Sequence, residues 1–149
     1  MNLNNFTIKS QEAIQKAQQM AMQYGHQAID PAHIFLAILE VDDNVTPYLL
    51  KKIGINPSII KRTTESMVQS LPKVSGGDGQ SYLSREANEV MQKANNLLKD
   101  FGDEYVAIEH LVLAILTSKN QVSQMLKDNG ENKKNIKEIT VLTSFPSKK

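Results

Sequence analysis

Apolar side chains recur at intervals of three and four residues through positions 13–24, and a second stripe in the same phase runs through positions 87–101. This spacing places the side chains along one face of a helix. Thr7 and Ser84 precede the two stripes, where they can cap the first free N–H groups, and a glycine follows each stripe at the position favoured for a left-handed stop. We therefore predict two long amphipathic helices with equivalent starts and ends.

The chain repeats itself with an offset of 77 residues. Between positions 12 and 39, ten of 28 residues are identical to the residue 77 places further on, without a gap. Self-similarity at a fixed offset is the signature of a duplicated structural unit. We interpret residues 6–71 and 82–145 as two copies of one unit, joined by a flexible connector at residues 72–81.

Each copy is expected to contain four helices. A cap residue followed by proline marks the start of a helix, and the first copy has three such pairs, with the last helix reaching about residue 71. The three starts are Asp30-Pro31, Thr46-Pro47 and Asn56-Pro57. In the second copy, the two short helices are expected at about 121–128 and 132–142.

The second helix of each copy is apolar on all sides, through residues 34–39 and 111–116. Such a helix is typical of a protein core. One unit of this size cannot cover both faces of its central helix, so the two copies should pack together. The predicted fold class is all-α, a tandem duplicated four-helix repeat with about eight helices and pseudo-two-fold symmetry.

Composition narrows the classes of function. Lys and Arg total 17 and Asp and Glu total 16, a net charge of +1, so no nucleic acid or anionic membrane is expected as a partner. The chain has no cysteine, which excludes disulfides and thiolate metal sites. Its longest apolar run is far shorter than the ~20 residues of a membrane-spanning helix, and no signal peptide opens it. A cytoplasmic location is therefore predicted.

The residues that could carry catalysis have simpler explanations. His33 and His110 occupy equivalent positions near helix starts, without the ligand spacing of a metal site, so we expect each imidazole to form local hydrogen bonds there. Glu109 suits the first turn of a helix and Asp103 a turn. A metal-dependent hydrolase built from these four residues is kept as an alternative. We predict no catalytic residue, metal or cofactor in this domain, and we expect His26 to be a solvated turn residue.

Apolar residues outside the narrow stripes indicate binding. Met91, Leu97 and Tyr105 crowd one stretch of the second copy. Two equivalent first helices can flank a groove, and methionine and aromatic side chains suit a surface that accepts varied apolar segments. The sequence therefore predicts a binding module that captures apolar segments, with Met91, Leu97 and Tyr105 among its contact residues.

Several segments resemble the N-terminal domain of the Clp/Hsp100 ATPases. They are residues 24–31, 33–39, 71–77, 102–106 and 109–111. The Leu-Pro-Lys-Val-Ser-Gly-Gly connector at 71–77 is similar to that of the ClpB type, the protein disaggregases. The resemblance covers residues 1–145, and it implies that residues 146–149 begin a linker to absent ATPase domains.

The resemblance also implies a function. It points to a domain that engages exposed apolar segments of unfolded or aggregated proteins and is not itself an enzyme. The parent would be a hexameric AAA+ ring that uses ATP and Mg in the absent domains and cooperates with the DnaK system, while the isolated domain would be a monomer. The alternative is an adaptor-docking N-terminal domain of the ClpA or ClpC type, which feeds a protease.

Site residues follow from the same resemblance. It associates Thr7, Asp103 and Glu109 with chaperone activity, and Met91 and Leu97 with an apolar substrate groove. With Tyr105, these residues form the predicted substrate-binding set. This chain departs from the family at two positions of that groove. One of them, which is leucine in some members, is His110 here, and the other is Lys93.

Overall fold

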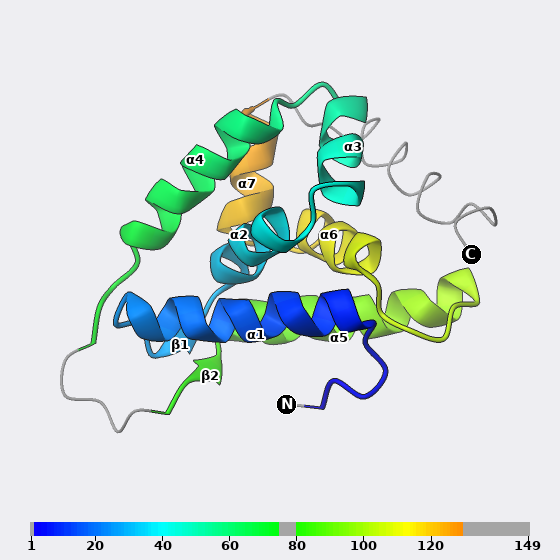
Figure 1. Cartoon of the computed structure of the whole chain (residues 1–149), viewed down its shortest axis with the longest axis horizontal. Helices are drawn as coiled ribbons and strands as arrows, with labels where there is room; N and C mark the ends of the chain where they lie inside the picture. The colour runs from blue at the N-terminus through cyan, green and yellow to red at the C-terminus, as the bar shows by residue number, and fades with distance from the viewer. Residues whose placement is uncertain (1, 75–79, 130–149) are drawn as a thin grey trace.

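The computed structural model describes residues 2–74 and 80–129, which form seven helices and two short strands (Figure 1). The elements are α1 (Ile8–Gln23), β1 (Ala28–Ile29), α2 (Pro31–Val41), α3 (Val45–Lys52), α4 (Pro57–Gln69), β2 (Tyr82–Leu83), α5 (Arg85–Phe101), α6 (Ile108–Thr117) and α7 (Gln121–Asp128). The predicted duplicated, mostly helical fold is confirmed. The helix expected at 132–142 and residues 75–79 of the connector lie outside the described residues.

The long helices α1 and α5 begin and end in the same way. The hydroxyl of Thr7 accepts a hydrogen bond from the Ser10 N–H, and the hydroxyl of Ser84 accepts one from the Ala87 N–H. Gly25, just after the Tyr24 cap of α1, and Gly102, at the end of α5, have φ angles of 77° and 68°, a left-handed conformation that costs least for glycine. The sequence-based prediction of equivalent caps is therefore confirmed.

Helices α2 and α6 form the centre of the molecule, and α1 and α5 lie along one side of them (Figure 1). Every residue from Pro31 to Ile38 and from His110 to Leu116 is buried. Helix α3 of the first copy packs against α6, and α7 of the second copy packs against α2. Each copy therefore covers the central helix of the other, which confirms the prediction of two core helices in a shared interior.

Two short backbone pairings join the copies, and the helical pattern did not predict them. Strand β1 runs parallel to β2, and the Ser84 N–H donates to the Ile29 carbonyl at 3.0 Å. Phe6 forms an isolated bridge with Val106, and the Thr7 N–H donates to the Val106 carbonyl, also at 3.0 Å. The residues of the second hydrogen bond match those of the first by the 77-residue offset. The segment that leads into the long helix of each copy thus pairs with a turn of the other copy.

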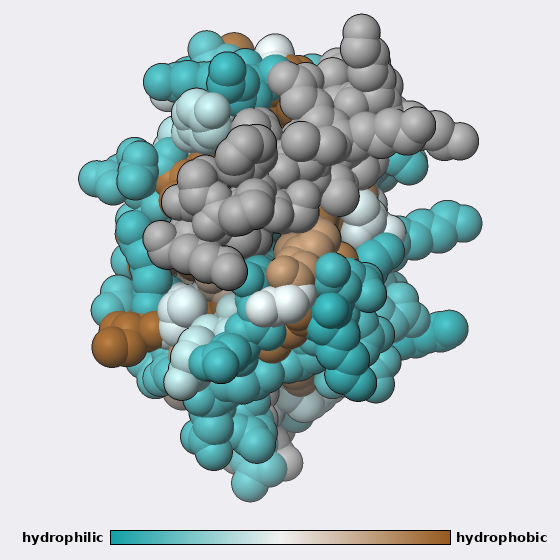
Figure 2. Space-filling model, turned by 90° about the vertical axis from the view of Figure 1, so that its right-hand side faces the viewer, coloured by the Kyte–Doolittle hydropathy of each residue, from teal (hydrophilic) through white to brown (hydrophobic). Residues whose placement is uncertain are grey.

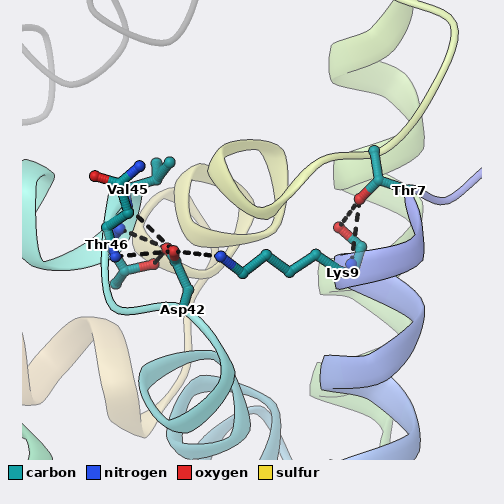
Figure 3. Close-up of polar contacts among 7 residues, drawn as sticks. Thr7, Lys9, Asp42, Val45 and Thr46 are labelled. Carbon is teal, nitrogen blue, oxygen red and sulfur yellow. Dashed lines mark hydrogen bonds and ion pairs between the residues drawn. The ribbon is translucent and has the colours of Figure 1, made fainter.

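A buried carboxylate fixes the start of α3 (Figure 3). Asp42 accepts hydrogen bonds from the backbone N–H groups of Asn44, Val45 and Thr46 and from the Thr46 hydroxyl, and Lys9 of α1 donates to it at 3.1 Å. Burial alone would raise the pKa of Asp42, but these hydrogen bonds, led by the one from the Thr46 N–H, hold the pKa below its usual value. Helix α3 consequently begins at Val45 with Asn44 at the cap position, two residues before the predicted pair of Thr46 and Pro47.

Replacing Asp42 should therefore destabilise the fold. Asp42→Ala leaves three N–H groups and a hydroxyl without their acceptor, and we expect it to lower the free energy of unfolding by about 3 kcal/mol. Lys9→Met removes only a partly exposed partner and should cost less than about 1 kcal/mol. Urea unfolding of the two variants measures both values, and equal losses would contradict this account of the α3 cap.

Candidate functional site

A groove of about 520 Å³ runs between α1, α5 and the paired segments that join the copies. Helix α5 contributes Asn88, Met91 and Asn95, whose spacing of three and four residues places them on one helical face. Gln18 of α1 lines it as well. The other lining residues come from the crossing segments of both copies and are Asn2, Phe6, Ile29, Ser81, Tyr82 and Leu83.

The side chains that line this groove carry no formal charge. Half of them are apolar or aromatic, and the others are amides or a hydroxyl. Tyr82 is 57% exposed, whereas Phe6, Ile29 and Met91 are buried. The parts of the lining that a partner can reach are therefore mainly the Tyr82 ring, Leu83 and the polar side chains, which can contact an apolar side chain and form hydrogen bonds with a peptide backbone.

Another hollow, of about 480 Å³, lies at the α3–α4 turn and is lined by one stretch of the first copy, within residues 47–58. Figure 2 shows a face on which hydrophilic residues predominate and apolar residues appear in small, separate patches. Scattered exposed apolar side chains are normal on a protein surface, whereas a concave site formed by several elements is a better candidate for binding. This favours the groove as the site to consider.

The predicted contact residues Met91 and Leu97 occupy different positions on α5. Met91 is 8% exposed and lines the groove. Leu97 is partly buried against the core and is absent from the groove lining. Their separation follows from the helix, because residues six apart point to different sides of it. A binding role for either residue stays a prediction.

The other four predicted residues gather near Val106, and we call Thr7, Asp103, Tyr105 and Glu109 the Val106 corner. Thr7 donates its N–H to the Val106 carbonyl, and the remaining three lie within three residues of Val106 along the chain. Tyr105 is 55% exposed, and Thr7, Asp103 and Glu109 are half-buried. The corner lies next to the groove, because Phe6, the neighbour of Thr7, lines the groove and pairs with Val106.

The two residues that depart from the family's groove pattern are engaged within the fold. Lys93 donates from Nζ to the Thr117 carbonyl at the end of α6, at 2.8 Å. His110 is 2% exposed, and its Nε2 lies 2.9 Å from Oδ2 of Asp103. A lysine and a histidine at these positions thus support α6 and the turn before it, and neither lines the groove.

Both histidines at the helix starts form the local hydrogen bonds that the sequence predicts. Nδ1 of His33 accepts from the Asp30 N–H at 2.9 Å, and Nδ1 of His110 accepts from the Ala107 N–H at 2.8 Å. The expectation for His26 was wrong. Its ring is only 4% exposed, stacks on Tyr24, and places Nδ1 2.8 Å from Nε2 of His33, because the turn folds back over the start of α2.

Metal binding has no candidate in the part of the chain that the structure describes. Among residues 2–74 and 80–129, no group of three or more His, Asp or Glu side chains is placed to hold an ion. The four residues of the hydrolase alternative are also divided between the copies, since His33 pairs with His26 whereas His110 pairs with Asp103. In the same residues, no helix has the length and apolar character needed to cross a membrane.

Comparison with known proteins identifies relatives of this architecture. Residues 5–129 match the Clp repeat (R) N-terminal domain family. The chain is 49% identical over 137 residues to the chaperone protein ClpB of Bacteroides thetaiotaomicron and 43% identical over 130 residues to that of Porphyromonas gingivalis. These matches cover 92% and 87% of this chain but only 16% and 15% of the relatives, so the chain spans about one sixth of their length.

Solved structures show the same fold. The Hsp104 N-terminal domain from Candida albicans superimposes with a TM-score of 0.79 at 23% identity, covering 93% of this chain and 90% of that one. The N-terminal domain of ClpD from Arabidopsis thaliana gives a TM-score of 0.70 at 19% identity, with 96% of each chain covered. At these identities, the similarity establishes the fold alone.

Proposed function

This chain belongs to the Clp repeat N-terminal domain family, and we propose on that premise that it engages substrates for a ClpB-type protein disaggregase. The domain captures exposed apolar segments of unfolded or aggregated proteins in the groove between α1 and α5. The observation that carries the proposal is the lining of that groove, which combines an apolar floor with amide side chains and has no formal charge. Such a lining accepts many apolar sequences, because no ion pair selects among them.

The groove should bind weakly. Burying apolar surface contributes about 25 cal/mol per Å², but lost translational freedom and the ordering of an unfolded segment remove much of that gain. A groove of about 520 Å³ therefore suggests a dissociation constant of roughly micromolar or higher. Weak capture allows a segment to be passed onward, and several tethered copies would raise the effective concentration of binding sites.

The Val106 corner extends this surface with polar groups. Asp103 is braced by His110, so its carboxylate keeps a defined position, and Glu109 lies in the first turn of α6. Tyr105 adds an exposed aromatic ring to the same corner. Substrate that leaves the apolar floor at Phe6 meets hydrogen-bonding groups there. We therefore assign Thr7, Asp103, Tyr105 and Glu109 to an outer contact zone, with Met91 in the groove itself.

The wider activity of the parent protein is part of this proposal. The domain has no catalytic role, and ATP and Mg bind in AAA+ domains beyond this chain. Those domains form a cytoplasmic hexameric ring that works with the DnaK system, while the isolated domain is a monomer. The charge balance of +1 supports polypeptide partners over nucleic acid or membrane.

Docking of adaptor proteins, as in the ClpA and ClpC types, is the second candidate. The same exposed residues could contact a folded adaptor, and the family includes both kinds of domain. The connector at 71–77 favours the ClpB type. The sequence of the adjoining domains distinguishes the two, since a coiled-coil middle domain belongs to the ClpB type and a protease-docking loop to the others.

Two exposed tyrosines provide a matched test of the groove. Tyr82 lies in the groove lining and is 57% exposed, whereas Tyr48 on α3 is 49% exposed and outside that lining. Because Tyr82 offers its ring to the substrate, Tyr82→Ala should weaken binding of a permanently unfolded polypeptide by about 3- to 10-fold, consistent with the loss of one aromatic contact. Tyr48→Ala should leave the affinity unchanged. NMR titration of each variant measures the affinity.

The same titration shows where the polypeptide binds. Chemical-shift changes should concentrate at the amides of Phe6, Ile29, Leu83 and Met91. Equal effects of the two tyrosine variants, or shift changes spread evenly over the surface, would contradict the groove as the binding site.

A further inference from the structure

The turns between α1 and α2 and between α5 and α6 are equivalent, but they are braced by different chemical pairs. His33 and His110 match by the 77-residue offset, and so do their partners, His26 and Asp103. The first copy therefore holds its turn with two imidazoles, whereas the second copy uses an imidazole and a carboxylate. This difference affects how each turn can accept a proton.

Hydrogen bonding fixes the proton positions in the first copy. Nδ1 of His33 accepts from the Asp30 N–H, so the single N–H of the neutral ring is at Nε2. That N–H donates to Nδ1 of His26 at 2.8 Å, which places the remaining proton of His26 on Nε2. Each ring thus uses its only acceptor nitrogen, and a proton added to either ring must break one of the two hydrogen bonds.

One nitrogen of the pair, the buried Nε2 of His26, has no hydrogen-bond partner among the described residues. A cavity of about 200 Å³ beside the His26 ring is lined by side chains without charge, including those of Met22 and Val74. Burial penalises the charged form of the neighbouring His33 ring, which is fully buried.

We propose that His26 and His33 form an acid-sensitive clasp, which holds the α1–α2 turn while both rings are neutral and releases it when either ring takes up a proton. The second copy has Asp103 where the first has His26 and therefore lacks this clasp. The released segment includes Ile29, whose carbonyl accepts from the Ser84 N–H and whose side chain lines the groove. Mild acid thus loosens the part of the groove floor that the first copy contributes.

Other ionisable groups bear on the pair. Asp30 lies in the same turn, where its negative charge and a positive charge on His26 attract each other. Glu86 at the start of α5 repels the negative charge of Asp30. Burial raises the pKa of Asp30, so protonation of this carboxylate stabilises the fold as the pH falls and opposes the effect of the histidines. Tyr24 contributes a stacked ring, 5.7 Å from that of His26 between centroids. The test must therefore compare variants of the pair itself.

The linkage between protonation and folding gives the size and sign of the effect of pH on stability. Burial, and then the neighbouring His26, lower the pKa of His33 from 6.5 to about 4. Because the folded value is the lower one, the stability that the neutral ring contributes is present above pH 6.5 and is lost as the pH falls toward 4. For His33 alone, the folding equilibrium constant should fall about 20-fold between pH 7 and pH 5.

The repeat supplies a matched pair of amides for the experiment. We would measure hydrogen-exchange protection at pH 7 and pH 5 for the Ser84 N–H, which donates to Ile29, and for the Thr7 N–H, which donates to Val106. Protection of Ser84 should fall more than that of Thr7 on acidification. His26→Asp, which copies the second turn into the first, should remove most of the difference, and Asp103→His should add a comparable loss at Thr7.

The outcomes separate the clasp from the proposed function. Unchanged protection of Ser84 at pH 5, or equal losses at the two amides in the unmodified chain, would overturn the clasp even if neither variant folds. The effect on the groove rests on the proposed function and is tested by titrating the unfolded polypeptide at both pH values. Weaker binding at pH 5 supports an effect of the clasp on the groove. Unchanged binding, together with lower protection of the Ser84 N–H, overturns that effect. Failure to bind at pH 7 would contradict the proposed function and leave the clasp intact.

Discussion

The structure depends on the exchange of backbone hydrogen bonds between the two copies. Each lead-in segment places a backbone N–H, of Thr7 or Ser84, and an apolar side chain, Phe6 or Leu83, beside a turn of the other copy. Pairing with the turn of the other copy satisfies the N–H of Thr7 or Ser84 and packs the apolar residue beside it against the core, where Phe6 is buried and Leu83 partly buried. The central helices α2 and α6 can then share one interior, since α3 and α7 each cover the partner's core helix.

The groove is a consequence of this exchange. Its floor contains Phe6 from one crossing and Ile29 and Leu83 from the other, and its sides come from α1 and α5. A single copy would supply only part of that lining. Duplication therefore produces a concave surface that neither copy has alone.

Much of the fold could be predicted from the sequence, because helix periodicity, caps and the 77-residue repeat are local or directly countable. The caps at Thr7 and Ser84, the buried runs of α2 and α6 and the hydrogen bonds of His33 and His110 all follow from such patterns. The strand pairings do not follow from such patterns, because strands of two residues are too short to show an alternation of apolar and polar side chains. The burial of His26 and the role of Asp42 were also missed, because each depends on contacts made only after the chain folds back. For the candidate site, the pattern identified Met91 but not the amides around it, which look like ordinary surface residues.

The backbone hydrogen bond between Thr7 and Val106 also affects how the chain folds during its synthesis. Its partners are separated by 99 residues, from 7 to 106, so the Thr7 N–H lacks this acceptor until residue 106 has left the ribosome. Until then, Phe6 and the outer faces of the first core helix lack their cover. Pairing with the second copy of another chain would therefore compete with closure within one chain during this interval.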